Sequence, residues 1–254
     1  MELLIGFAIA VLIAMTGVGA GSIIAPLLIL LLHVPVETAV GTALAYSVAV
    51  KLVVVPVQIW RRQVVWRTLG IILLTGIPGV ALGSFIFKRV AHSASNTFWL
   101  YLALGLMIAT SSAWHIYRHF RPTAISEDRT DRPGWLAVAM LPVGAEVGFS
   151  SSGAGALGTL AMLSLTPLDA RSIVGTDLAF GLCLSLIGGI LHLSHGGLDS
   201  TLLINLVAGG GLGGLVGTGL ASRIPVRTMR LALSLWLFTM GVQLCWHALS
   251  QVRG

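Results

Sequence analysis

The sequence predicts an all-α integral membrane protein built as a duplicated, inverted repeat, and three observations predict it. The first is composition: 56% of the 254 residues are hydrophobic and 9% are charged, which is far too apolar for a soluble globule. The second is a series of apolar stretches long enough to span a bilayer, which are read as helices because lipid excludes open strands. The third is an internal repeat, in which motifs of residues 14–89 recur in residues 148–223.

The repeat keeps a constant offset of 134 residues (153 − 19 and 174 − 40). Its best-preserved motifs are Gly19-Ala20-Gly21-Ser22 with Gly153-Ala154-Gly155-Ala156, and Val40-Gly41-Thr42 with Val174-Gly175-Thr176. An unchanged offset means that no insertion separates the motifs of one half. Duplication of this kind in an apolar chain is typical of secondary transporters, whose substrate site lies between the two halves.

The elements follow in the same order in each half. The first segment, Leu3–Leu32 or Trp135–Leu165, is about 30 residues long and is interrupted near its middle by Gly and Ser. Three stretches follow in each half, and each approaches the ~20 residues that cross ~30 Å of hydrocarbon. These stretches are 36–60, 68–87, 97–117, 168–191, 200–221 and 227–249. We therefore divide the chain into a first repeat at 1–117, a cytoplasmic linker at 118–134 and a second repeat at 135–254.

The Lys and Arg positions indicate how the interrupted segments enter the membrane. If both segments cross fully, the Lys and Arg of loops and ends divide 8 to 6 between the two faces, whereas re-entrant hairpins divide them 11 to 3. Because positive residues favour the cytoplasmic side, we expect re-entrant hairpins, periplasmic termini and three crossings in each half, which inverts the halves. The charges alone equally allow a model in which only the second segment is re-entrant, and repeat symmetry favours two. The start has an acidic residue, Glu2, and no basic region, so no cleaved signal peptide is expected.

The two interruptions are predicted to bind substrate. Glycines let two half-helices turn and expose backbone N–H groups, and neighbouring hydroxyls add donors. A half-helix that begins there directs its partial positive end at the bilayer midplane, which favours a small anion. The predicted ligands are Gly19, Gly21 and Ser22 in the first break and Ser151, Ser152, Gly153 and Gly155 in the second. The alternative is that these small residues only let helices pack closely.

Four ionisable residues fall within or beside apolar segments, where charge is costly and marks function. Lys51 lies roughly 15 Å from the end of its helix at 1.5 Å per residue. It either supplies positive charge to the anion or extends its stem to the interface. Asp177 is predicted to take the coupled proton, or else to hydrogen-bond the neighbouring break. His192, whose pKa can fall near physiological values, and Glu146 are the other proton-coupling candidates, with an interfacial role open for Glu146.

No metal, cofactor or nucleic acid is predicted. Histidines lie one helical turn apart in two places, but no carboxylate or cysteine completes a metal site at either. These pairs are His115 with His119 and His192 with His195. The net charge of +6 comes from residues in short loops beside spanning helices, so membrane orientation explains it better than nucleic-acid binding.

The motifs resemble those of a known family of membrane anion transporters. The pattern around Gly19–Ser22, followed by Pro26, Pro35, Glu37 and Val40-Gly41-Thr42, resembles the first half of the sulfite exporter TauE/SafE-like family. The second half is similar at Ser151–Gly155, at Val174–Asp177, and at His192, Gly196 and Asp199. The resemblance spans nearly the whole chain, with departures at Ala20, Ala154 and Leu160 that concern the cargo more than the fold. It implies a bacterial inner-membrane carrier of small, often sulfur-containing anions such as sulfite or organosulfonates, driven by the proton gradient.

The expected function is therefore a secondary transporter whose partners are a small anion, protons and the lipid bilayer. A passive anion channel, or a carrier of another small anion, is the alternative, since a channel shares the glycine-rich site without needing titratable groups. An enzyme is not expected, because the chain shows no nucleophile–base pair or metal-ligand cluster. The sequence predicts no oligomeric state.

Overall fold

The computed structural model describes residues 2–16, 20–91, 97–120, 131–151, 157–193, 199–220 and 226–253. These residues form ten helices and no strand, which confirms the predicted all-α class. Six helices contain a stretch long and apolar enough to cross a membrane, and each coincides with one predicted stretch. They are α3 (Val36–Trp60), α4 (Trp66–Ala91), α5 (Thr97–Phe120), α8 (Ala170–Leu193), α9 (Ser200–Leu220) and α10 (Val226–Arg253).

The two interrupted segments each form a pair of shorter helices. The first pair is α1 (Glu2–Thr16) and α2 (Ala20–Leu31), and the second is α6 (Pro133–Ser150) and α7 (Leu157–Leu165). Helix breaks near the middle of both segments are therefore confirmed. In α6 and α7 the chain enters and leaves at the same end of the molecule, because the backbone N–H of Arg132 donates a hydrogen bond of 3.1 Å to the carbonyl of Leu165.

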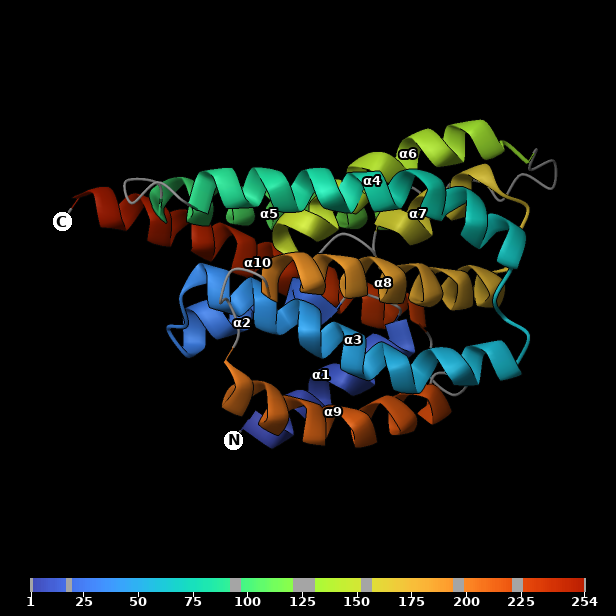
Figure 1. Ribbon diagram of the computed structural model, residues 1–254, viewed down its shortest axis with the longest axis horizontal. Coiled ribbons are helices and arrows are strands. Elements are labelled where there is room, and N and C mark those ends of the chain that lie inside the picture. Colours follow the sequence, from blue (N-terminus) through green and yellow to red (C-terminus); the bar gives the residue numbers. More distant parts are fainter. Residues whose placement is uncertain are drawn as a thin grey trace.

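The ends of the helices can be followed in Figure 1. Both chain ends lie toward one end of the molecule, and the connection between α3 and α4 lies at the other. An ion pair of 3.9 Å between Arg67 and Asp131 places the start of α6 beside that connection. Trp60 and Trp66 flank the connection and are 83% and 63% exposed, as expected for aromatic residues at a membrane interface.

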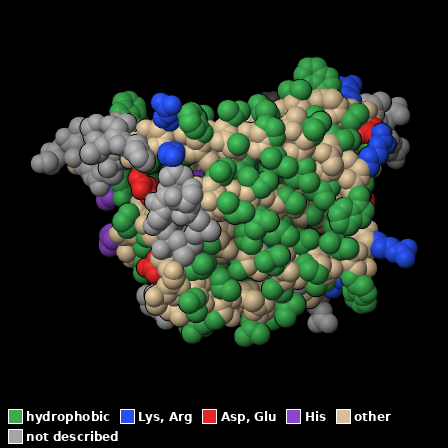
Figure 2. Space-filling view, viewed as in Figure 1, with side chains coloured by type: hydrophobic (Ala, Val, Ile, Leu, Met, Phe, Trp, Pro, Cys, Tyr) green, Lys and Arg blue, Asp and Glu red, His purple; other side chains and the backbone are tan. Residues whose placement is uncertain are grey.

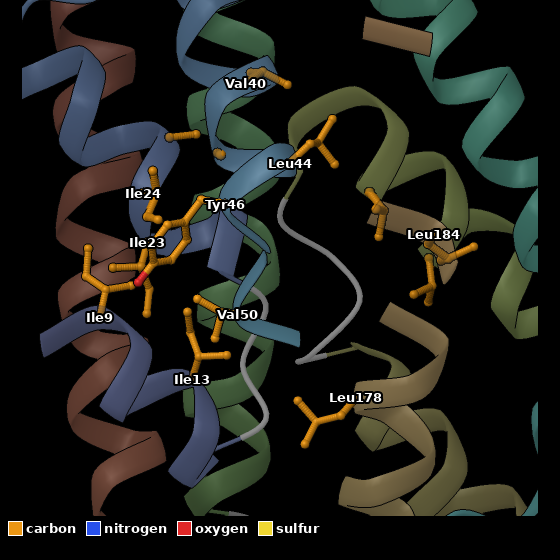
Figure 3. Packing of buried hydrophobic residues seen from close by; sticks show 14 of the residues in the cluster. Ile9, Ile13, Ile23, Ile24, Val40, Leu44, Tyr46, Val50, Leu178 and Leu184 are labelled. Carbon is orange, nitrogen blue, oxygen red and sulfur yellow. The ribbon is translucent and has the colours of Figure 1, made fainter. Parts of the chain in front are cut away.

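The surface agrees with a membrane-spanning arrangement. Figure 2 shows hydrophobic side chains over the middle of one face, with Lys, Arg, acidic and His side chains gathered toward its two ends. Below the surface, the ring of Tyr46 extends from α3 toward Ile23 and Ile24 of α2 and Ile9 of α1 (Figure 3). Its hydroxyl donates a hydrogen bond to the carbonyl of Gly6 in α1. The first helix pair is thus held against α3 by a buried aromatic residue.

Helices of different halves pack with their backbones in contact. Helix α4 lies along α6, and α9 lies along α1. A Cβ atom at Gly83 of α4 would overlap the carbonyl oxygen of Ala145 in α6, and one at Gly217 of α9 would crowd that of Val11 in α1. Positions 83 and 217, like positions 11 and 145, differ by 134. The same contact therefore occurs twice, with the halves exchanged.

A pair of hydrogen bonds follows the same rule. The hydroxyl of Thr176 in α8 accepts from the backbone N–H of Val65, just before α4, at 3.0 Å. The hydroxyl of Thr42 in α3 accepts from the backbone N–H of Asp199, just before α9, at 3.4 Å. Both threonines belong to the repeated Val-Gly-Thr motif, which in each half holds the start of a helix of the other half against a central helix.

Candidate functional site

The candidate site lies along one face of α8. Asp177, Ser185 and His192 are 2%, 2% and 7% exposed, and their spacing of eight and seven residues places them within about 80° of one another around the helix. Their polar groups therefore face protein rather than lipid, as polar residues in spanning helices do when they serve function. Along the axis, Ser185 lies about 12 Å from Asp177 and His192 about 22 Å from it, at 1.5 Å per residue. The polar face consequently divides into two clusters.

The central cluster consists of Ser47, Lys51, Thr159, Asp177 and Ser185. The Lys51 ammonium donates to the Ser185 hydroxyl at 3.3 Å, and the Ser47 hydroxyl lies 3.0 Å from the same oxygen. The Thr159 hydroxyl donates to Oδ2 of Asp177 at 2.8 Å. Helices α3, α7 and α8 thus bring together two predicted residues, Lys51 and Asp177, and three hydroxyls.

Lys51 is a buried cation. Its side chain is 3% exposed, so it does not extend to the interface. The ammonium has three donors, and within the described part of the chain it has one hydrogen-bond partner, Ser185. It also lies within Coulombic range of the Asp177 carboxylate. A lysine held in this way in a membrane-spanning helix has donors and charge to offer an anion.

Asp177 faces the beginning of α7. Thr159, its hydrogen-bond partner, is the third residue of that helix. Gly158 lets the carboxylate approach, since a Cβ atom there would lie 2.5 Å from Oδ1 of Asp177. A negative charge at a helix N-terminus is stabilised by the helix dipole. The structure therefore places an internal carboxylate at the half-helix end where the sequence predicts an anion.

The histidine cluster consists of Ser84, Phe87, Gly148, Phe149 and His192. Nε2 of His192 lies 2.9 Å from the carbonyl oxygen of Gly148, and the Ser84 hydroxyl donates to the same oxygen at 3.2 Å. Since a carbonyl only accepts, Nε2 carries the hydrogen and Nδ1 is the atom that gains or loses a proton. The Phe87 ring packs 4.9 Å from the His192 ring and 5.5 Å from that of Phe149. Glu146, near the same end of α6, is buried as well.

Ser151 ends α6 in an uncommon backbone conformation. Its φ of 63° is left-handed, and its backbone N–H donates to the carbonyl of Val147 at 2.8 Å. The hydroxyl is buried and has no hydrogen-bond partner among the residues that the structure describes. A buried hydroxyl without a partner is costly. Ser151 therefore has a donor to offer at the second break, and its role as a ligand stays a prediction.

Other predicted ligands cannot be placed in the site. Gly19, Ser152, Gly153 and Gly155 lie outside the described residues. Gly21 and Ser22 lie in the first turn of α2, and the structure describes their backbone alone. Their roles stay predictions. Over the ranges that are described, no group of three His, Cys, Asp or Glu side chains could hold a metal ion.

Three residues of the central cluster, Ser47, Thr159 and Ser185, were not predicted from the sequence. One signal could have found Ser185, because it lies 134 residues after Lys51 and is its counterpart in the repeat. Asp177 and His192, which the sequence groups as proton carriers, do not lie together.

Comparisons with known proteins agree with this architecture. The family model for the sulfite exporter TauE/SafE matches residues 2–244. The probable membrane transporter protein YjnA of Bacillus subtilis strain 168 is 29% identical over 251 residues, which is 95% of this chain and 98% of that protein. YdhB of the same strain, also a probable membrane transporter protein, is 24% identical over 239 residues, or 92% and 94% of the two chains. A probable membrane transporter protein of Xylella fastidiosa strain 9a5c is 30% identical over 226 residues, or 87% and 82%.

No solved structure matches the chain. The family match nevertheless covers nine of the ten helices described above and most of α10, and with them five of the six apolar spans in full and most of the sixth. The protein is thus a multi-pass membrane transporter rather than an enzyme, and it belongs to the sulfite exporter TauE/SafE family.

Proposed function

We propose that the protein is a secondary transporter that moves a small, sulfur-containing anion of the sulfite or organosulfonate class across the bacterial inner membrane together with protons. The observation that carries the proposal is the buried ammonium of Lys51, which has one hydrogen-bond partner in the described part of the chain. A cation is expensive inside a membrane protein unless it serves a substrate or an ion pathway. Ser151, with its buried hydroxyl, adds a second group suited to an oxyanion.

The proton coupling that we propose rests on Asp177, with His192 and Glu146 as further carriers. All three are buried and belong to side-chain types whose proton affinity responds to burial and to neighbouring charge. Asp177 lies within Coulombic range of Lys51. The proton site and the anion site would then share one charged environment.

We also propose that the two halves are inverted repeats joined by a cytoplasmic linker, with periplasmic termini. The paired contacts of Gly83 and Gly217, and the paired hydrogen bonds of Thr42 and Thr176, support this arrangement, because each pair joins positions 134 residues apart. Each helix pair at a break is then a hairpin that opens toward the face from which it entered.

Gradient-driven transport is the direct test of the function. Purified protein in liposomes should accumulate radiolabelled sulfite or a small sulfonate when a pH gradient is imposed. Coupling of one proton to one anion gives about tenfold accumulation per pH unit, because one unit corresponds to ~1.4 kcal/mol. A protonophore should abolish the accumulation. If the anion reached only equal concentrations inside and outside, whatever the pH gradient, the result would contradict the proposal and favour a passive channel.

Cysteine labelling tests the topology. After Cys183 and Cys245 are replaced by serine, single cysteines are introduced at Glu2 and at Arg129, the latter in the linker. In intact spheroplasts a membrane-impermeant maleimide should label Glu2→Cys, whereas Arg129→Cys should react only after permeabilisation. Equal labelling of Arg129→Cys in intact cells would show that the linker lies outside and that the proposed orientation is wrong.

A further inference from the structure

Both features that could attract an anion in the central cluster already face a carboxylate. The first turn of α7 presents Thr159 to Oδ2 of Asp177 at 2.8 Å, and Gly158 clears the space for Oδ1. The Lys51 ammonium lies within Coulombic range of the same carboxylate. Asp177 therefore occupies the electrostatic position that a substrate anion would take.

The charges around this position are few. Helices α3, α4, α6 and α7 pack against α8, and they bring one cation, Lys51, to the central cluster. The partly buried thiol of Cys183 in α8 lies within Coulombic range of Lys51. Glu146 of α6 and His192 of α8 are buried as well, and His192 lies about 22 Å along the helix from Asp177. The charged residues of α4 lie in its first and last turns and are exposed, and α7 has none.

We propose that Asp177 and the transported anion are alternative partners of Lys51 and the start of α7, so that the substrate is a monovalent oxyanion that binds when Asp177 carries a proton. The inference rests on the proposed transport function and deepens it. Before binding, the cluster holds one ammonium and one carboxylate. Afterwards the proton has neutralised the carboxylate and the anion has taken its place beside the ammonium. The buried charge is zero in both states, and one proton moves with one anion.

The charge balance selects the substrate class. A sulfonate or hydrogen sulfite carries one negative charge and leaves the loaded cluster neutral. A divalent anion such as sulfate leaves a net buried charge of minus one, which a spanning segment tolerates poorly. By Coulomb's law at a protein-like dielectric, an ionised carboxylate at a separation of about 6 Å would weaken binding of even a monovalent anion on the order of 100-fold.

The test is a set of binding measurements on the purified full-length protein, with methanesulfonate and sulfate as probes. As Asp177 ionises with rising pH, affinity for methanesulfonate should fall by about 100-fold in all. Calorimetry in buffers of different ionisation enthalpy should show up to one proton taken up per anion bound. Sulfate should bind roughly 100-fold more weakly than methanesulfonate.

At a pH high enough to ionise Asp177 in the wild type, Asp177→Asn should bind methanesulfonate about 100-fold more tightly than the wild type, with no dependence on pH. Asp169→Asn is the matched control, since Asp169 is the exposed acid that caps α8 through the backbone N–H of Arg171; it should keep the wild-type pH dependence. Unchanged or weaker binding by Asp177→Asn overturns the proposal. Binding of methanesulfonate to the wild type without proton uptake also overturns it, as does affinity that does not rise when the pH falls. These two outcomes hold whether or not the variant folds.

The two proposals fail separately. Proton-linked binding without gradient-driven flux in liposomes would support the competition between Asp177 and the anion and contradict proton-coupled transport. Gradient-driven flux together with pH-independent binding would support the proposed transport function and contradict the competition between Asp177 and the anion.

Discussion

Replacing Lys51 with methionine is expected to weaken binding of methanesulfonate by roughly 100-fold, because a hydrogen bond to a charged group contributes up to about 3 kcal/mol and each 1.36 kcal/mol is tenfold. Methionine keeps most of the length of the side chain and removes the charge. The dissociation constant, measured by calorimetry at low pH, checks the prediction. Gradient-driven uptake in liposomes should fall in parallel.

Two measurements separate this effect from loss of structure. At a low pH, where Asp177 carries a proton, Lys51→Met should unfold at the wild-type temperature or higher, because the substitution removes a costly buried charge and leaves no unpaired carboxylate behind. Ser185→Ala removes a neutral partner of Lys51 and should weaken binding less than about tenfold. Wild-type affinity in Lys51→Met would show that the ammonium does not bind the anion.

The largest expected loss of stability comes from Gly83→Val. The carbonyl oxygen of Ala145 occupies the space that the new side chain needs, and a backbone atom cannot rotate away as a side chain can. Helices α4 and α6 would have to separate, which should cost more than about 3 kcal/mol, the upper range for overpacking. The midpoint of thermal unfolding in detergent, together with the yield of monodisperse protein, checks the prediction.

Glycines of the same helices supply the controls. A Cβ atom at Gly70 of α4 or at Gly211 of α9 would meet no atom within 4 Å. Gly70→Ala and Gly211→Ala should therefore unfold at the wild-type temperature or slightly above it, since Ala favours helix. Gly217→Val should resemble Gly83→Val, because it repeats the contact in the other half. Equal stability of Gly83→Val and Gly70→Ala would mean that α4 and α6 do not pack as described.

The helices and their breaks could be predicted from the sequence because the bilayer fixes them. A span needs a minimum apolar length, and glycines cluster in the two segments that the structure divides into α1 with α2 and α6 with α7. For Lys51 the sequence predicts its depth in the membrane, but it leaves open whether the side chain faces the anion or extends to the interface. Packing of α3 on α8, which brings Ser185 to the ammonium, decides between them.

The partners of Asp177 could not be predicted for a different reason. Thr159 lies 18 residues earlier in the chain, across a turn between two helices, and a threonine in an apolar helix more often bonds its own backbone. The sequence groups Asp177 with His192 as proton carriers only because both side chains can take up a proton. Both residues lie on the same helix, α8, and their spacing of 15 residues (192 − 177) keeps them about 22 Å apart.

The contact between Lys51 and Ser185 has a geometric consequence. The two positions are counterparts in the repeat, and in the inverted arrangement that we propose, counterparts touch only where they lie close to the rotation axis that would carry one half onto the other. When two such halves trade conformations, every other point in the molecule changes its surroundings, but a point on the axis keeps its depth. An ion held there would stay in place while access to it opened first from one side of the membrane and then from the other.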